Sequence, residues 1–295
     1  MKQQKLLKHE KLRLKNVIIP DPQKLEKIKE HFKKEGNQKL HVLTDFDNTL
    51  TRAFVDGKRV PSLISVLRDS NYLGHEYAEK ANALYRKYHA IETDPTISKK
   101  ERKKAMHEWW SIHFNLLIKS GLNRKDIEKV VKSRKIKFRQ GALEFIDFLH
   151  KQNIPLIIMS SSGLGEDAIA MYLKKENRLY NNIYIISNKY EWDQNGNAIG
   201  VKQPIIHSMN KDETMIQNFP VFDVVKNKKN VLLLGNNIGD VGMIEGFNYD
   251  NLIKIGFLNE KIEENLEEFK KNFDIIITND SGMDYINQLL RELFE

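Results

Sequence analysis

The stretch Leu43-Thr44-Asp45-Phe46-Asp47-Asn48-Thr49-Leu50-Thr51 places two carboxylates directly after a short apolar run. A carboxylate such as Asp45 can attack the phosphorus of a phosphate ester, and Asp47 can protonate the leaving oxygen and later deprotonate water. Because two carboxylates repel a phosphate dianion, such a site also needs a cation, and Mg²⁺ is the usual one. The alternative is a turn in which the Asp and Asn side chains make local hydrogen bonds alone.

The composition is that of a soluble globular protein. The chain has 295 residues, 40% hydrophobic and 30% charged, which is enough for a large core plus an inserted domain. Its apolar runs are far shorter than the roughly 20 residues that span a bilayer, and the N-terminus lacks the apolar segment of a signal peptide. The lack of cysteine excludes disulfides and thiolate zinc sites. We therefore expect a cytoplasmic protein with no membrane partner, either a monomer or a weak dimer.

The positive charge is concentrated at one end of the chain. The net charge is +8, but residues 1–40 hold 12 Lys and Arg against 5 Asp and Glu, a net of +7, which leaves +1 for the rest. A nearly neutral body does not favour a nucleic acid partner, and a lysine-rich segment is most often a solvated face. The alternative is a nucleic-acid-associated protein that uses its first 40 residues.

The N-terminal and middle parts of the chain are predicted to be helical. Asp21-Pro22 opens a helix and Gly36 ends it. After a first strand over residues 40–46, apolar stripes at helical spacing continue to about Arg134 without a strand candidate. These patterns predict a basic N-terminal helical segment over 1–39, a core domain formed by 40–58 and 136–295, and an inserted all-helical cap domain over 59–135.

From residue 141 onward, apolar strands alternate with helices. Asn195-Gly196 predicts a hairpin. Continuous apolar strands between helices indicate an α/β fold whose parallel sheet is covered on both faces. Ligands in such folds bind at the carboxyl ends of the strands, which is where Asp45, Ser160–Ser162 and Asn236–Asp240 fall. The predicted helices cover 142–151 and the residues after Gly165, and the predicted strands cover 154–159, 183–187, 231–234, 252–256 and 274–277.

The pattern D-x-D-x-T-[L/V] that begins at Asp45 resembles the first motif of the haloacid dehalogenase (HAD) superfamily of phosphohydrolases. The resemblance implies a Rossmann-like core with Asp45 as nucleophile and Asp47 as acid and base. It also implies a phosphate-binding Ser or Thr after a second strand. Anchoring on Gly163-x-Gly165 selects Ser161, with Ser162 beside it, whereas counting from Pro155 selects Ser160, so both registers stay open.

Two further superfamily positions complete the expected site. The resemblance implies a lysine that balances the phosphate charge, and we prefer Lys211 to Lys202. Gly235-Asn236-Asn237-Ile238-Gly239-Asp240 resembles the motif G-D-x-x-x-D, but Asn236 stands where the superfamily has an acidic Mg²⁺ ligand. An amide oxygen can bind Mg²⁺ but brings no charge, so we expect weaker metal binding or greater dependence on Asp240. The expected metal site comprises Asp45, Asp47, Asn236 and Asp240.

Several segments between about residues 40 and 290 carry a more specific resemblance. They are Arg86–Pro95 (Y-x-A-I-E-x-D-P), Glu108-Trp109-Trp110, Ser187-Asn188, Asn210-Lys211 and Ile255–Asn259 (I-G-[YF]-L-N). Together they are similar to the cytosolic 5′-nucleotidase III family, the pyrimidine 5′-nucleotidases. The resemblance implies a helical cap after the first strand and Mg²⁺-dependent dephosphorylation of nucleoside 5′-monophosphates, typically CMP and UMP. Some members of that family accept 7-methyl-GMP, and some transfer phosphate.

The same resemblance implies that Glu92 recognises the base of the substrate. A carboxylate can accept a hydrogen bond from the exocyclic amine of cytosine or from the protonated edge of a methylated guanine. One or two of Tyr88, Trp109, Trp110 and His113 could form a stacking wall, although aromatics at helical spacing are more often core. Two alternatives stay open, namely a nucleotide-binding protein weakened by Asn236, and a phosphatase for 7-methyl-GMP or another small phosphometabolite.

Overall fold

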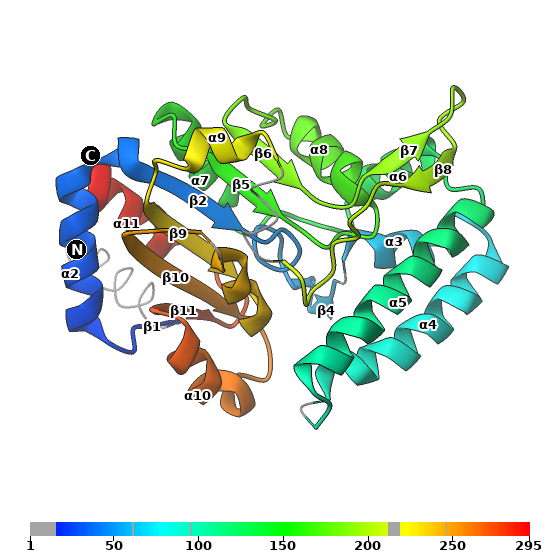
Figure 1. Ribbon diagram of the computed structural model, residues 1–295, viewed down its shortest axis with the longest axis horizontal. Helices are drawn as coiled ribbons and strands as arrows, with labels where there is room; N and C mark the ends of the chain where they lie inside the picture. Colours follow the sequence, from blue (N-terminus) through cyan, green and yellow to red (C-terminus); the bar gives the residue numbers. More distant parts are fainter. Residues whose placement is uncertain (1–15, 61, 95, 212–218, 246) are drawn as a thin grey trace.

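The fold is built on a seven-stranded sheet with strand order β1-β11-β10-β9-β2-β5-β6 (Figure 1). The computed structural model describes residues 16–60, 62–94, 96–211, 219–245 and 247–295. Neighbouring strands run parallel except for β1 and β11, which are antiparallel. The predicted α/β class with a mostly parallel sheet is therefore confirmed. The strands are β1 Val17–Ile18, β2 Leu40–Thr44, β5 Leu156–Met159, β6 Ile183–Ile186, β9 Asn230–Gly235, β10 Asn251–Leu258 and β11 Ile275–Thr278.

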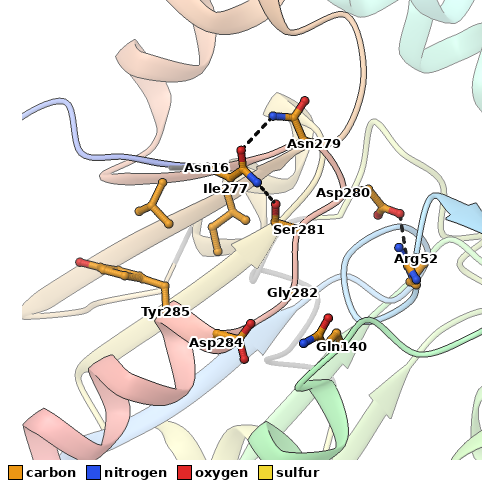
Figure 2. Close-up of a pocket in the computed structure, with 11 residues that line it drawn as sticks. Asn16, Arg52, Gln140, Ile277, Asn279, Asp280, Ser281, Gly282, Asp284 and Tyr285 are labelled. Carbon is orange, nitrogen blue, oxygen red and sulfur yellow. Dashed lines mark hydrogen bonds and ion pairs between the residues drawn. The ribbon is translucent and has the colours of Figure 1, made fainter. Parts of the chain in front are cut away.

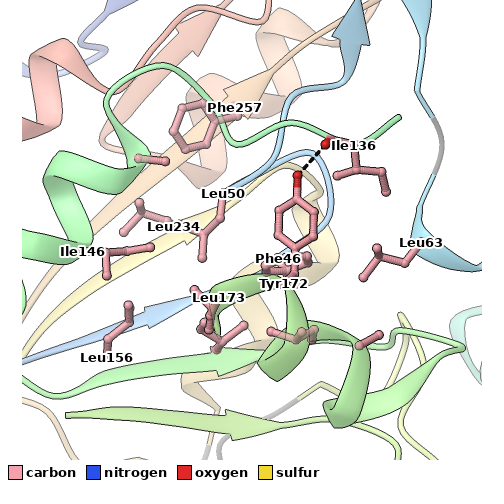
Figure 3. Packing of buried hydrophobic residues seen from close by; sticks show 14 of the residues in the cluster. Phe46, Leu50, Leu63, Ile136, Ile146, Leu156, Tyr172, Leu173, Leu234 and Phe257 are labelled. Carbon is pink, nitrogen blue, oxygen red and sulfur yellow. Dashed lines mark hydrogen bonds between the residues drawn. The ribbon is translucent and has the colours of Figure 1, made fainter. Parts of the chain in front are cut away.

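Successive strand residues point to opposite sides of the sheet, and since residues on both sides are apolar, both faces are covered. In β2, Val42 joins one hydrophobic cluster and Leu43 joins the other. The larger cluster includes the rings of Phe46 and Tyr172, which Figure 3 shows packed with aliphatic side chains. It is covered by α2 Pro22–Glu35, α7 Ala142–Lys151, α8 Gly165–Lys175 and α11 Asp284–Phe294, and the smaller one by α9 Val221–Val225, the 3₁₀ segment η3 Ile238–Ile244 and α10 Ile262–Asn272.

Between β2 and β5 the chain forms the helical insert, which we define as α3 Leu63–Asp69, α4 His75–Thr93, α5 Lys99–Lys119 and α6 Arg124–Lys132. Figure 1 shows α4 and α5 side by side, away from α2. The predicted stripes are largely buried, with Tyr77, Ala81 and Tyr88 in α4 and six residues from Met106 to Leu117 in α5. Capping boxes at Ser98 and Asn123 start α5 and α6, and each satisfies backbone N–H groups that a helix start leaves unpaired.

The predicted hairpin at Asn195-Gly196 is present as β7 Tyr190–Trp192 and β8 Ala198–Val201. It contacts the helical insert. The Ala198 amide donates to the Leu122 carbonyl at 2.8 Å, and the Asn123 Nδ2 donates to Asn197 Oδ1 at 2.8 Å. The hairpin, which follows β6 in the chain, therefore holds the insert by hydrogen bonds, in addition to the chain connections of the insert to β2 and β5.

Two short elements were not predicted. β1 lies in a charged segment, and its two residues are too few to show an apolar alternation. A second hairpin, β3 Phe54–Val55 with β4 Lys58–Arg59, precedes the insert. Residues 1–15 of the predicted N-terminal segment lie outside the described residues, and its described part contains β1, α2 and the 3₁₀ turn η1 Asn37–Lys39. Within the described residues, every helix is too short or too polar to cross a bilayer.

A buried arginine fixes the loop that follows β2. The Arg139 side chain is fully buried. Its guanidinium donates to the carbonyl oxygens of Asn48 at 2.6 Å, Thr49 at 2.8 Å and Ser281 at 2.7 Å. It also donates to Asn259 Oδ1 at 3.0 Å and pairs with Asp280 Oδ1 at 3.1 Å. Because these groups follow β2, β10 and β11, one side chain joins three loops at the carboxyl edge of the sheet.

We predict that Arg139→Lys lowers the free energy of unfolding by about 2–3 kcal/mol, because a lysine cannot reproduce the planar fork of donors and leaves buried carbonyls unpaired. Urea unfolding measures the change. Arg178→Lys is the matched control, since Arg178 lies near the surface, pairs with Asp147 at 2.9 Å and should cost less than about 1 kcal/mol. Equal stability of the two variants would contradict this role of Arg139.

Candidate active site

The predicted site residues gather at the carboxyl ends of three adjacent strands. Since β9, β2 and β5 are neighbours in the sheet, the loops that follow them meet at one edge. They bring Asn236–Asp240, Asp45 and Ser160–Ser162 together. One cavity of about 260 Å³ is lined by Asn236, Asn237 and Asp240, by Asp45 and the three serines, and by Asp47, Lys211, Glu92 and His113. The structure therefore places the predicted catalytic, phosphate-binding and metal-binding residues around a single cavity.

The centre of the cavity is a buried cluster of three charges. Lys211 Nζ lies against Asp45 Oδ1 and 3.2 Å from Asp240 Oδ1. The three side chains are between 5% and 7% exposed. Burial alone would lower the pKa of Lys211, but the charges of Asp240 and Asp45 outweigh it and raise the pKa, so the ammonium stays charged. The other candidate, Lys202, is exposed.

Burial dominates the titration of the two acids in the first motif. It raises the pKa of Asp45 above its ordinary value, although the Lys211 charge opposes the shift. Burial also raises the pKa of Asp47 to about 6, although a hydrogen bond with the Leu63 backbone and the charge of Lys211 oppose this shift. A carboxyl group whose pKa is near neutrality is suited to giving and taking a proton. Asp47 Oδ1 is buried and has no hydrogen-bond partner among the described residues.

Asp240 uses both carboxylate oxygens within the protein. Oδ2 accepts from the backbone amides of Asn236 and Asn237, each at 3.0 Å, while Oδ1 faces Lys211. The backbone comes this close because Gly235 has no side chain. A Cβ there would lie 2.5 Å from the Cβ of Asp240. Asp240 therefore orients Asn236 and Lys211, and its place in the expected metal site stays a prediction.

Asn236 faces the oxygens of the first motif. In one amide orientation its Oδ1 accepts from the Thr49 hydroxyl at 3.2 Å. In the reverse orientation its nitrogen donates to the Asp47 carbonyl oxygen at 3.1 Å and to Asp45 Oδ2 at 3.2 Å. The end of this side chain therefore contacts both the backbone and a carboxylate of the first motif.

The oxygen atoms of the site fit a hard cation such as Mg²⁺, which prefers oxygen ligands. The end of the Asn236 amide lies 3.1 Å from the Asp47 backbone carbonyl oxygen and 3.2 Å from Asp45 Oδ2. In the described part of the chain, no three His, Cys, Asp or Glu side chains form a metal-binding group. A cation here would therefore depend on backbone and amide oxygens beside the Asp45 carboxylate.

Hydrogen bonds distinguish the three serines after β5. Ser160 Oγ accepts from the Ser162 amide at 3.2 Å, and Ser162 Oγ accepts from the Leu164 amide at 3.3 Å. Both serines are nearly buried, at 1% and 4% exposure. The Ser161 hydroxyl is partly exposed at the cavity and has no partner among the described residues. Ser161 is therefore the most exposed of the three serines, while the O–H groups of Ser160 and Ser162 are donors that these two bonds leave unused.

Asn188 joins the serine loop to the segment that carries Lys211, which was not expected from the sequence. The side chain is 1% exposed. Its Nδ2 donates to the carbonyl oxygens of Ser162 at 3.2 Å and Ile206 at 2.9 Å, and its Oδ1 accepts from the Ile206 amide at 2.9 Å. The Ser187-Asn188 segment thus has a structural function at the site, because one amide fixes two of the loops that form it.

Aromatic rings from the helical insert form one wall of the cavity. The rings of Trp109 and Trp110 stack at 5.5 Å and 21°, and those of Trp110 and His113 at 5.6 Å and 12°. Burial and then the Arg68 charge lower the pKa of His113 to about 4, so its ring is neutral at pH 7. Tyr88 packs under Trp109 and does not line the cavity, so the wall contains three of the four predicted aromatics.

Tyr85 and His89 also line the cavity and were missed from the sequence. Their rings stack at 4.8 Å and 13°, and the Arg68 guanidinium lies 5.1 Å from the Tyr85 ring. Tyr85, His89 and Glu92 are spaced i, i+4, i+7 and so share one face of α4. That spacing was the signal that could have found them once Glu92 was chosen.

A larger cavity of about 530 Å³ lies beside the end of β11 (Figure 2). Figure 2 shows Arg52 turned toward Asp280, and the two side chains pair at 3.5 Å. Asp280 also accepts from the backbone amides of Ala53 at 2.9 Å and Phe54 at 3.0 Å. Its carboxylate is therefore used to hold the chain, and none of the predicted site residues lines this cavity.

Comparisons with known proteins agree with this geometry. A sequence model described as pyrimidine 5′-nucleotidase (UMPH-1) matches residues 48–294. The human 7-methylguanosine phosphate-specific 5′-nucleotidase is 34% identical over 278 residues, which cover 94% of this chain and 92% of that protein. The putative cytosolic 5′-nucleotidase 3 of Caenorhabditis elegans is 30% identical over 261 residues, covering 86% of this chain and 69% of that protein.

Solved structures are similar over most of the chain. Cytosolic 5′-nucleotidase IIIB bound to cytidine has a TM-score of 0.86 and 28% identity, covering 95% of this chain and 94% of that one. A phospho-aspartyl intermediate analogue of phosphoserine phosphatase has a TM-score of 0.51 and 15% identity, covering 87% and 98%, and shows a shared fold alone. The chain therefore belongs to the pyrimidine 5′-nucleotidase (UMPH-1) family, a family of hydrolases with the HAD fold, as its sequence motifs predicted.

Proposed function

We propose that this protein is a cytosolic, Mg²⁺-dependent 5′-nucleotidase that hydrolyses nucleoside 5′-monophosphates through a phosphorylated aspartate. The observation that carries the proposal is the cavity itself, which is lined both by the buried cluster of Asp45, Lys211 and Asp240 and by Glu92 with an aromatic wall. A phosphate and a base are the two parts of a nucleotide that these two groups of side chains would bind. The cytosolic location rests on the name of the nematode relative.

The proposed reaction has two steps. In the first, an Asp45 carboxylate oxygen bonds to phosphorus, the bond from phosphorus to O5′ breaks, and Asp47 donates a proton to O5′. In the second, Asp47 takes a proton from water as the water oxygen bonds to phosphorus, which releases phosphate and restores Asp45. Lys211 and Ser161 hold the phosphoryl oxygens, so that catalysis rests on positioning and charge stabilisation.

A bound Mg²⁺ would neutralise the charge between the phosphate and the carboxylates. Asp45, the Asp47 carbonyl oxygen and Asn236 would hold it, and Asp240 would orient Asn236 through its backbone amide. The neutral Asn236 leaves this set with one negative charge fewer than an aspartate would supply. We therefore expect a functional but comparatively weak metal site.

The base end favours cytosine and 7-methylguanine. A carboxylate such as Glu92 accepts hydrogen bonds, so it prefers a base edge that presents N–H groups over the carbonyl edge of uracil. The neutral rings of Trp110 and His113 can stack on a flat base, and the positive charge of 7-methylguanine would be attracted to the faces of these rings. The human relative is named for 7-methylguanosine phosphate, and the solved neighbour is bound to cytidine. We accordingly propose both CMP and 7-methyl-GMP as substrates.

The helical insert would act as a cap over the core. We propose the division expected from the sequence, with the cap over 59–135 and the core over 40–58 and 136–295. In support, Gly163 in the serine loop lies against Trp110 of α5 so closely that a Cβ there would be 2.7 Å from the indole ring. A cap that contacts the phosphate end of the core can exclude water during the reaction.

Phosphate release from CMP, UMP, GMP, dCMP and 7-methyl-GMP, with Mg²⁺ or with EDTA, tests the proposed function. We expect release that requires Mg²⁺ and that is faster for the cytosine and 7-methylguanine nucleotides than for UMP and GMP, because these bases match Glu92 and the neutral aromatic wall. Absence of release from all five nucleotides would contradict the proposal and favour a nucleotide-binding protein that has lost turnover.

Asp45→Asn should lower kcat by about a thousandfold or more, because a neutral amide oxygen cannot form the covalent intermediate. Steady-state phosphate release measures the loss. Asp56→Asn, an exposed acid in the turn between β3 and β4, is the matched control and should keep wild-type activity. Substantial turnover by Asp45→Asn would remove Asp45 as the nucleophile.

Asn236→Asp should lower the Mg²⁺ concentration that gives half-maximal activity by several-fold, because it adds a negative charge to the set of oxygen ligands. A Mg²⁺ titration of activity measures this shift. Asn181→Asp adds the same charge at an exposed residue that does not line the cavity, and should leave the titration unchanged. If both variants behave like the wild type, our placement of the cation at Asn236 is wrong.

A further inference from the structure

Both carboxylate oxygens of Glu92 are held by other side chains. Oε1 accepts a hydrogen bond from the Ser208 hydroxyl, and Oε2 lies 3.2 Å from His89 Nδ1. His89 belongs to the same helix as Glu92, whereas Ser208 comes from the core, 116 positions along the chain. The contact between Ser208 and Glu92 therefore crosses from the core to the helical insert at the base end of the cavity.

Ser208 belongs to a short segment, residues 205–211, whose shape is fixed from within. The His207 amide donates to Asn210 Oδ1 at 2.7 Å, and Asn210 Nδ2 donates to the Ile205 carbonyl at 2.9 Å. Asn188 fixes Ile206 at the start of this segment. Lys211 ends it, and its ammonium contacts Asp45. One fixed segment therefore contacts Glu92 through Ser208 and the proposed nucleophile Asp45 through Lys211.

Glu92 needs such a partner because it lies at an unfavourable place for a carboxylate. It is the penultimate residue of α4, where the carbonyl ends of the helix repel negative charge. A glutamate also loses about 1.5–2 kcal/mol of rotamer freedom when it is held in one position. Burial alone would raise the pKa of Glu92, but hydrogen bonds from His89 and Ser208 outweigh it and lower the pKa, so the carboxylate stays charged.

We propose that Ser208 is a positioning residue for base recognition, which sets the Glu92 carboxylate at a fixed distance from the phosphate site by linking it to the segment that carries Lys211. The inference rests on the proposed function, since it assumes that Glu92 binds the base. It makes base selectivity depend on a core residue whose hydroxyl is bound to Glu92. The ligand class is a nucleoside 5′-monophosphate whose base presents N–H donors toward Glu92.

A double-mutant cycle tests this role. The wild type, Ser208→Ala, Glu92→Ala and the double variant are compared on CMP, on 7-methyl-GMP and on ribose 5-phosphate, which keeps the sugar and phosphate but lacks the base. Ser208→Ala should raise KM for the nucleotides about fivefold more than for ribose 5-phosphate, the effect of one typical hydrogen bond. In the Glu92→Ala background the same change should have no further effect, since the two residues act as one unit.

Two additional variants separate positioning from general damage to the fold. Ser208→Thr keeps the hydroxyl and should restore most of the nucleotide selectivity. Ser111→Ala removes an exposed serine of α5 that bonds to the His107 carbonyl, and it should behave like the wild type. The proposal would be overturned if Ser208→Ala raised KM equally for the nucleotides and for ribose 5-phosphate. It would also be overturned if Ser208→Ala had its full effect on KM in the Glu92→Ala background.

Calorimetric binding of CMP to the same proteins, each also carrying Asp45→Asn, distinguishes this inference from the proposed function. If the wild type releases no phosphate but CMP binding still shows the coupling between Ser208 and Glu92, the proposed hydrolysis fails while the positioning role stands. If CMP binds with no coupling, the positioning role fails independently of turnover. If CMP does not bind at all, both are wrong.

Discussion

The site depends on one buried ammonium group between two buried carboxylates. Lys211 contacts both Asp45 and Asp240 with all three side chains nearly excluded from water. Removing either kind of charge would leave the others uncompensated at a cost of several kcal/mol. This electrostatic requirement holds the loops after β2 and β9 and the segment 205–211 in one arrangement. The same arrangement brings the Lys211 ammonium and the serine loop to one cavity, where a phosphate would lie beside a cation that offsets the carboxylates.

Buried amide and guanidinium groups extend that constraint to the surrounding loops. Arg139 fixes the backbone of the first motif to the loops after β10 and β11, and Asn188 fixes the serine loop to the segment 205–211. Because these donors satisfy buried carbonyl groups, each loop has one low-energy position. Ser161, Lys211 and Asp45 are therefore held in position by the protein itself, and preorganisation of this kind would support the proposed phosphoryl transfer.

Much of this could be predicted from the sequence because its signals are local. Apolar runs identified the core strands. The two carboxylates Asp45 and Asp47, directly after the first of these strands, indicated the carboxyl edge of the sheet as the place of the candidate site. Other features depend on contacts between distant parts of the chain. β1 is a strand through its pairing with β11, and the choice of Ser161 over its neighbours depends on which hydroxyls the backbone already uses. Arg139, among 48 basic residues, has no local signal of burial.

The central claim is that Asp45 becomes phosphorylated during turnover. The most direct test is to mix the protein with 7-methyl-GMP or CMP and Mg²⁺, quench in acid within milliseconds, and analyse the digested protein by mass spectrometry. Our account predicts a transient mass increase of one phosphoryl group on the peptide that contains Asp45, which disappears as phosphate is released. Rapid phosphate release without any phosphorylated Asp45 peptide would contradict it, and would indicate direct attack by water.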